Sequence, residues 1–175
     1  MAPIYLSIGY NCNPRMYLRW HHGLRKSNGY LSCPFDLCVT SYEGFRKCID
    51  TNFEHFLDDL HLIPGPNAEG DRSLCGKGGH NITNAYGMVF NHEGSTHSHL
   101  FNEGKNDDEF FIRDDFKEFR LRYSRRIQNY LNYIKTYNEI IFIYNPDPEL
   151  KNIKEELLEY LTETYKNKIV QLKCV

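Results

Sequence analysis

The strongest constraint on the fold of this chain is a tight turn between an apolar run and a helical segment near the N-terminus. Residues 4–8 have the composition of a buried strand, and residues 9–13 form a turn sequence, Gly-Tyr-Asn-Cys-Asn. Pro14 then favours the first turn of a helix over residues 13–22. This order places the Cys12 thiol at a helix N-terminus, where backbone N–H groups and the helix dipole stabilise a thiolate. A small buried core cysteine has the same local sequence.

Strand and helix patterns alternate through the rest of the chain. A 3.6-residue apolar period predicts a long helix over residues 116–134, with Asp114 or Asp115 as its cap. Residues 61–81 are rich in glycine and proline and predict an irregular loop. The remaining patterns predict a helix over 42–58 with a break near Asn52, a strand at 85–90, and a strand–helix–strand unit at 139–144, 149–165 and 168–172.

This alternation predicts an α/β fold in which residues 1–175 form a single domain. We expect one mixed, mostly parallel sheet of about four strands, with helices on both faces. The functional site is expected where the strands at residues 4–8 and 86–90 end, beside the helix that begins at Asn13.

Composition restricts the functional classes. The net charge is −2 and the pI is about 6.4, which makes a nucleic-acid partner unlikely without excluding one. No apolar run approaches the ~18 residues that span a bilayer, and the N-terminus lacks the pattern of a signal peptide. The six cysteines form no Cys-x-x-Cys pair, which is typical of reduced thiols in a cytoplasmic protein.

A nucleophilic thiolate needs an imidazole to accept its proton and a group that orients the imidazole. His92 follows a predicted strand, and Asp36 follows Pro34 at the start of a loop, so both are candidates at a sheet edge. Asp36 has an alternative role, since a carboxylate in such a turn also caps backbone N–H groups. His80, His97 and His99 lie in predicted loops and remain alternatives to His92.

Six short motifs resemble, in the same order, those of the papain-like cysteine peptidase family DUF1796, over about residues 4–144. The resemblance implies a cysteine hydrolase that acts on an amide or acyl substrate, by hydrolysis or acyl transfer. It implies Cys12 as the nucleophile, His92 as the general base and Asp36 as the orienting acid. The motifs lie at residues 8–12, 24–26, 34–36, 52–57, 86–92 and 123–127.

Two further residues are candidates for substrate binding. The Asn11 side chain and the Cys12 backbone N–H are candidates for an oxyanion hole, although asparagines near turns also bond their own backbone. On the long predicted helix, Arg125 and Arg126 point about 100° apart, so at most one of them faces the core. An inward Arg126 would hold Asp36 or an anionic substrate, and the alternative is a solvated helix face.

Two other functional classes compete with the enzyme. Histidines and a cysteine supply zinc-type ligands, but without the spacing of known zinc sites, so we expect no resident metal and no cofactor. An inactive module that binds a protein or a nucleic acid would carry the same thirteen tyrosines, Trp20 and arginine-rich helix. The ligand candidates are Cys75, His80, His92, His97 and His99.

Overall fold

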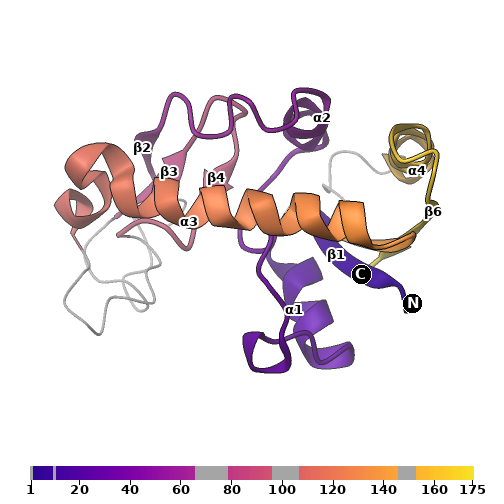
Figure 1. The fold of residues 1–175 in the computed structure, drawn as a ribbon. Helices are drawn as coiled ribbons and strands as arrows, with labels where there is room; N and C mark the ends of the chain where they lie inside the picture. The colour runs from indigo at the N-terminus through magenta and orange to yellow at the C-terminus, as the bar shows by residue number, and fades with distance from the viewer. Residues whose placement is uncertain (1, 10, 66–78, 96–106, 146–152) are drawn as a thin grey trace.

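The computed structural model describes residues 2–9, 11–65, 79–95, 107–145 and 153–175. Helices and strands are mixed along it, in the arrangement that Figure 1 shows. The strands are β1 (Ile4–Gly9), β2 (His61–Pro64), β3 (His80–Thr83), β4 (Val89–Phe90), β5 (Glu139–Asn145) and β6 (Ile169–Cys174). The helices are α1 (Asn13–His21), α2 (Tyr42–Asp50), α3 (Asp108–Thr136) and α4 (Ile153–Thr164), with a short 3-10 turn at Lys26–Asn28.

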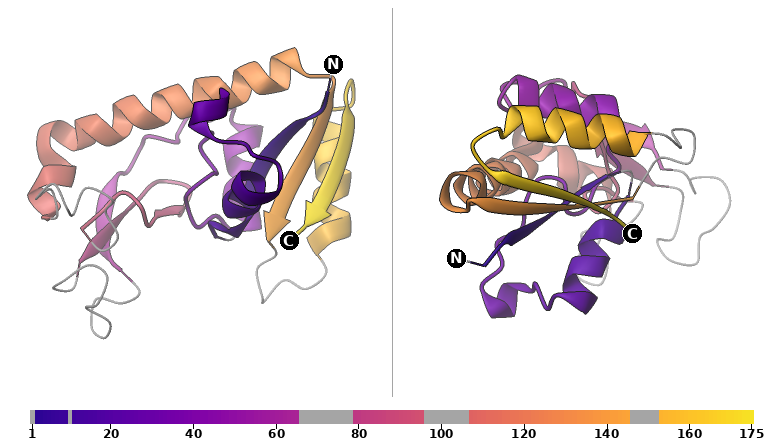
Figure 2. Two further views of the ribbon diagram at one scale, coloured as in Figure 1. Left: turned by 90° about the horizontal axis from the view of Figure 1, so that it is seen from below. Right: turned by 90° about the vertical axis from the view of Figure 1, so that its right-hand side faces the viewer.

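The α/β class is confirmed, but the described strands divide into two sheets instead of one sheet of about four strands. The first is parallel, in the order β1-β5-β6, with Ile4 opposite Ile140 and Glu139 opposite Ile169. Helix α1 covers one face of this sheet and α4 covers the other, as the right-hand view of Figure 2 shows. The predicted strand–helix–strand unit is confirmed, although the expected start of its helix lies outside the described residues.

The second sheet is antiparallel, in the order β2-β3-β4. It corrects the prediction of an irregular loop over residues 61–81, because both ends of that segment form strands. The strand predicted at 85–90 shortens to Val89–Phe90, since Gly87 adopts a φ of 69° and turns the chain. Val89 also pairs with Val39, which ties the loop before α2 to this sheet.

Helix α3 extends along the length of the molecule past both sheets, as Figure 1 shows. Its buried residues belong to the same core as those of the sheets. Asp107 caps it by accepting a hydrogen bond from the Phe110 N–H at 2.8 Å. The helix therefore begins earlier than the predicted cap at Asp114 or Asp115, where the backbone is non-helical and the helix kinks. Among the described residues, no helix is both long enough and apolar enough to cross a membrane.

An aromatic core joins α3 to the second sheet. Phe90 of β4 packs against Phe119 and Tyr123, with ring centroids 4.8 Å away in both cases. Phe56 contacts both Phe90 and Tyr123. All four side chains are at most 2% exposed, so this core fixes where β4 ends relative to α3.

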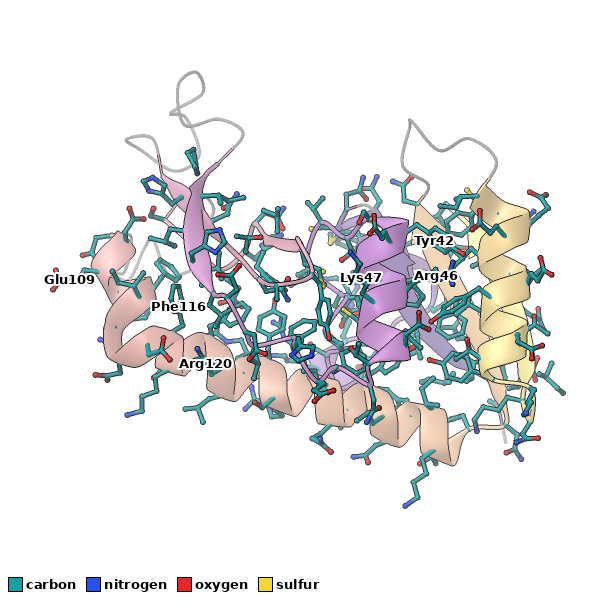
Figure 3. The ribbon with its side chains drawn as sticks, turned by 90° about the horizontal axis from the view of Figure 1, so that it is seen from above. Tyr42, Arg46, Lys47, Glu109, Phe116 and Arg120 are labelled. Carbon is teal, nitrogen blue, oxygen red and sulfur yellow. The ribbon has the colours of Figure 1, made fainter. Side chains whose placement is uncertain are left out.

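Helix α2 lies beside α4, as Figure 3 shows through Tyr42 and Arg46. Its N-cap is Ser41, which accepts a hydrogen bond from the Gly44 N–H at 3.0 Å. The helix ends at Asp50, and the predicted break near Asn52 is confirmed by positive φ angles of 49° at Asn52 and 64° at Phe53. The predicted extension to residue 58 is therefore wrong.

Candidate active site

Cys12 occupies the N-cap position of α1, as the turn sequence predicts. Pro14 lies in the first turn of the helix, and the Cys12 carbonyl accepts a hydrogen bond from the Met16 N–H at 3.0 Å. The side chain is half-buried. The thiol therefore lies beyond the carboxyl end of β1, at the edge of the parallel sheet.

Asn11 stabilises the turn that carries Cys12. Its Oδ1 atom accepts hydrogen bonds from the Asn13 backbone N–H at 2.9 Å and from Nδ2 of Asn145 at 3.1 Å. The second bond links the turn to the end of β5. Asn11 thus bonds the backbone of its own turn, which the sequence analysis gave as the alternative to an oxyanion-hole role.

His92 lies in the turn that follows β4, where the Glu93 N–H donates to the Phe90 carbonyl at 2.9 Å. Its Nε2 atom is 3.4 Å from Sγ of Cys12. The structure thus brings the predicted thiol and the predicted imidazole together, within the range of a sulfur–nitrogen hydrogen bond. Residues from the edges of two different sheets supply the pair.

Asn91 is a third member of this group that the sequence analysis missed. Both its Oδ1 and its Nδ2 atoms are 3.7 Å from Sγ of Cys12. With the amide oriented so that Nδ2 faces the sulfur, Asn91 donates a hydrogen bond to it. The sequence did contain a signal for Asn91, because this residue directly precedes His92 and follows the same strand.

The pKa of the Cys12 thiol is raised from its ordinary value because the side chain is largely buried, and the hydrogen bond from Asn91 opposes that shift. Burial of the side chain therefore opposes the thiolate that the position at the helix N-terminus favours. Burial favours the neutral thiol, so formation of a nucleophilic thiolate requires an acceptor for its proton. The imidazole of His92 lies in the position to accept it.

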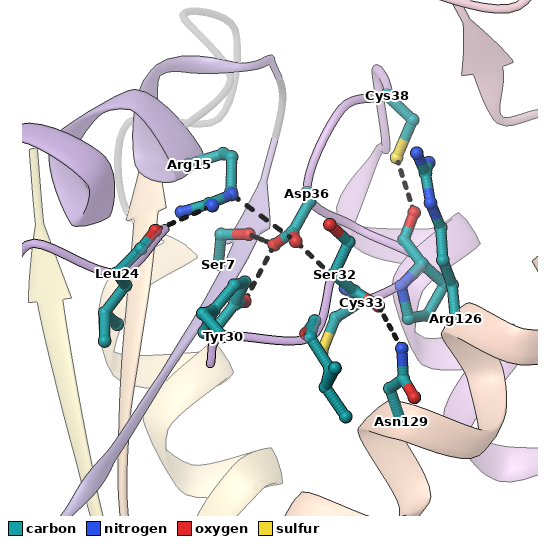
Figure 4. A network of polar contacts seen from close by, with 12 residues as sticks. Ser7, Arg15, Leu24, Tyr30, Ser32, Cys33, Asp36, Cys38, Arg126 and Asn129 are labelled. Atoms are coloured by element: carbon teal, nitrogen blue, oxygen red, sulfur yellow. Dashed lines mark hydrogen bonds and ion pairs between the residues drawn. The ribbon is translucent and has the colours of Figure 1, made fainter. Parts of the chain in front are cut away.

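Asp36 lies in a buried polar network between β1 and α1, shown in Figure 4. Its carboxylate accepts hydrogen bonds from the Ser7 hydroxyl, from the Tyr30 hydroxyl at 3.1 Å and from the Cys33 N–H at 2.9 Å. Nε of Arg15 lies 3.5 Å from it. Burial raises the pKa of Asp36, and Arg15 opposes the shift. The hydrogen bond from the Cys33 N–H is the backbone-capping contact that the sequence analysis gave as the alternative to orienting His92.

Arg126 points inward, with 11% of its side chain exposed, whereas Arg125 is exposed. The acidic residue closest to Arg126 in the described structure is Glu93, with Nη2 and Oε1 4.0 Å apart. Arg122 donates a hydrogen bond to the other oxygen of Glu93, which is only 3% exposed. Arg15, and not Arg126, forms the ion pair with Asp36.

A cavity of about 750 Å³ opens beside His92. Its lining comes from α1, the 3-10 turn, the loop before α2, the segment after β4 and the helix α3. A second cavity of about 480 Å³ shares Met16, Arg19, Lys26, Ser32 and Leu37 with the first. The imidazole therefore faces a space large enough to hold part of a substrate.

The metal alternative finds no support in the described residues, which contain no cluster of three or more metal-ligating side chains. Nδ1 of His80 is within hydrogen-bond distance of Oδ2 of Asp108, at 2.6 Å. The other three loop candidates, Cys75, His97 and His99, lie outside the described residues.

Comparison with known proteins agrees with the motifs. A family model described as "Putative papain-like cysteine peptidase (DUF1796)" matches residues 4–174. No curated protein and no solved structure matches the chain significantly. The match covers nearly all of the 175 residues. The chain therefore belongs to the family that this model describes.

Proposed function

We propose that this protein is a cysteine hydrolase in which Cys12 is the nucleophile and His92 is the general base. The observation that carries the proposal is the distance of 3.4 Å between Sγ of Cys12 and Nε2 of His92, at the N-cap of α1. A nucleophile within hydrogen-bond reach of a base is the geometry that thiol catalysis needs. Membership of the family supports the same class of chemistry.

The reaction begins with transfer of the Cys12 proton to Nε2 of His92. The sulfur then attacks the acyl carbon of an amide, and the carbonyl π electrons move to the oxygen. When the tetrahedral intermediate collapses, the carbon–nitrogen bond breaks and the imidazolium protonates the leaving amine, which leaves a thioester. Water attacking the thioester completes hydrolysis, and an amine acceptor completes acyl transfer instead. Asn91 stabilises negative charge on the sulfur before the attack.

Asp36 acts in this proposal as a positioning residue. Its carboxylate connects the loop before α2 to Arg15, one turn from Cys12 on helix α1. The Val39–Val89 pair connects the same loop to the strand that precedes His92. Asp36 therefore fixes the distance between the two reacting groups from the buried side of the site.

The cysteines indicate a reducing compartment. All five cysteines in the described part of the chain are free, and three of them are fully buried. The proposed nucleophile is active only as a free thiol. We therefore place the protein in the cytoplasm as part of this proposal.

Alkylation by iodoacetamide tests the Cys12–His92 pair without a known substrate. The extent of labelling at each cysteine is measured by peptide mass spectrometry in a Cys75→Ser background, with the exposed Cys174 as the reference thiol in the same molecule. We expect Cys12 to react faster than Cys174 at neutral pH. His92→Gln should slow Cys12 by about tenfold or more, since it removes the proton acceptor.

The matched control is His61→Gln, because His61 is an exposed histidine on β2 and is not part of the site. This variant should leave the Cys12 rate unchanged. A Cys12 rate no faster than that of Cys174 and unaffected by His92→Gln would overturn the proposal. That result would favour the inactive binding module.

A further inference from the structure

The residues that line the cavity beside His92 are mostly cationic where they are charged, whereas the whole chain has nearly equal numbers of cationic and acidic residues. The chain has 21 lysines and arginines against 23 acidic residues. In contrast, Glu93 is the single acidic residue among the described residues that line the cavity. Five cationic side chains share this lining: Arg19, Lys26, Arg122, Arg125 and Arg126.

Glu93 neutralises only part of this charge. The carboxylate of Glu93 accepts a hydrogen bond from Arg122 and lies 4.0 Å from Arg126, so one negative charge serves two guanidinium groups. Glu93 is 3% exposed, and its single negative charge does not balance the five cationic side chains of the lining. The local excess of positive charge lies directly beside the proposed general base.

A second, independent observation is that two arginines that line the cavities each have a buried guanidinium nitrogen without a hydrogen-bond partner in the described structure. Nη1 of Arg126 is buried and has no hydrogen-bond partner among the described residues. Nη1 of Arg15 is also buried without a hydrogen-bond partner, and Arg15 is among the residues that line the adjoining smaller cavity. Buried guanidinium N–H groups normally have partners, and leaving them without one is costly. An anionic ligand is the partner that these donors fit best, because a guanidinium bonds carboxylate and phosphate oxygens in a fork.

We propose that the substrate carries an anionic group, a carboxylate or a phosphate, which binds in this arginine-lined cavity while its acyl carbon lies at Cys12. The inference rests on the proposed function and adds the substrate class. The exposed Arg19, Lys26 and Arg125 attract the anion electrostatically. The inward Arg126 then donates to it, beside His92.

The test compares two alkylating reagents of nearly the same shape, iodoacetate, which is an anion, and the neutral iodoacetamide. For each cysteine the measured quantity is the ratio of the iodoacetate rate to the iodoacetamide rate, again in the Cys75→Ser background. An anion-binding cavity should make this ratio at least about threefold larger for Cys12 than for Cys174. Salt should reduce the difference, since screening weakens the attraction.

The variant Lys26→Gln/Arg125→Gln removes two exposed charges from the lining and is not expected to disturb the core. It should lower the ratio for Cys12 by about threefold, and because the ratio compares two reagents at the same thiol, any change in the thiolate population cancels. Arg126→Gln should lower the ratio further, provided circular dichroism shows that it folds. The matched control is Lys135→Gln, which removes the same charge from an exposed position of α3 outside the lining.

Each outcome separates the two proposals. A reactive, His92-dependent Cys12 whose ratio equals that of Cys174 overturns the anionic substrate and leaves the cysteine hydrolase standing. A Cys12 that is slow with both reagents overturns both. If the iodoacetate-to-iodoacetamide ratio is larger for Cys12 than for Cys174 and stays so in both Lys26→Gln/Arg125→Gln and Arg126→Gln, the anion does not bind in this cavity.

Protection experiments distinguish the two sources of the anion. Inorganic phosphate and succinate are added separately during iodoacetamide labelling of Cys12, with potassium chloride at equal ionic strength as the reference. Stronger protection by phosphate identifies a phosphate group, and stronger protection by succinate identifies a carboxylate. Equal rates in all three solutions would contradict the proposal.

Discussion

Sγ of Cys12 and Nε2 of His92 lie 3.4 Å apart across 80 residues of sequence. Cys12 is held by α1, which packs on β1 and β5 of the parallel sheet. His92 is held by the turn after β4 of the antiparallel sheet. The distance between the two groups therefore depends on how the two sheets are joined. The buried core that residues of both sheets share and the Val39–Val89 pair supply that connection.

Asn91 variants should change the titration of Cys12. Asn91→Leu removes the donor that opposes the effect of burial, so the pKa of Cys12 should rise further. Asn91→Asp adds a negative charge beside the sulfur and should raise it more. Each unit of increase slows alkylation by about tenfold at neutral pH.

The measurement is the pH profile of Cys12 alkylation in the His92→Gln background, where the titration of the imidazole does not interfere. The profiles should converge at high pH, where the sulfur is fully ionised in every variant. The control is Asn138→Asp, an exposed position outside the site. An unchanged profile in Asn91→Leu would mean that the amide does not interact with the thiolate.

Arg15→Met should destabilise the fold by about 3 to 5 kcal/mol at neutral pH, because it leaves the buried charge of Asp36 without its ion pair. The folded-state pKa of Asp36 is already raised, so protonation of this carboxyl favours the folded state, and its ionisation costs stability as pH rises through that pKa. Without Arg15 that cost grows. The loss caused by Arg15→Met should therefore shrink as pH falls and Asp36 takes up a proton.

Urea denaturation of both proteins at about pH 8 and about pH 5 measures this difference. Asp36→Asn in the Arg15→Met background removes the buried charge and should recover part of the stability at the higher pH. A loss from Arg15→Met that is equal at both pH values would contradict an ionised Asp36.

Three cysteines should be inert in the folded protein. Cys33, Cys38 and Cys48 are fully buried, and burial raises the pKa of Cys38 to about 12. In the Cys75→Ser background we expect labelling by a thiol reagent such as Ellman's reagent at Cys12 and Cys174 alone. Addition of a denaturant should expose the other three together. Native labelling of Cys38 as fast as that of Cys174 would contradict the packing described above.

Gly94→Ala should destabilise the segment that carries His92 and Glu93. An added Cβ at this position overlaps the backbone carbonyl of His80 on β3, and a backbone atom of a paired strand has little freedom to move. The expected loss is about 2 to 3 kcal/mol, measured by denaturation, together with slower alkylation of Cys12.

Gly29→Ala is the comparison for that prediction. Its φ of 84° makes a side chain strained, but nothing lies within 4 Å of the added Cβ. We expect a loss of about 1 kcal/mol and an unchanged Cys12 rate. Similar effects of the two substitutions on the Cys12 rate would show that the segment after β4 does not depend on its contact with β3.

Several elements follow from the sequence because their signals are local. Pro14 and the turn before it set the N-terminus of α1, and the apolar period of residues 116–134 is that of a helix. Strands β2 and β3 were missed because they are four residues long and border a segment rich in glycine and proline. Their pairing is stabilised by contact with each other and not by local preference.

The sequence by itself determined the α/β class and the position of Cys12 at a helix N-terminus, and the resemblance of its motifs to a known family selected His92 among several candidate histidines. Only the tertiary structure decided that Asn91 joins this pair, that Arg15 is the partner of Asp36, and that Arg126 turns toward Glu93. Local periodicity is encoded by neighbours within a few residues. These contacts depend instead on how the two sheets come together over one buried core, and the burial that raises the pKa of the Cys12 thiol likewise exists only in the folded chain.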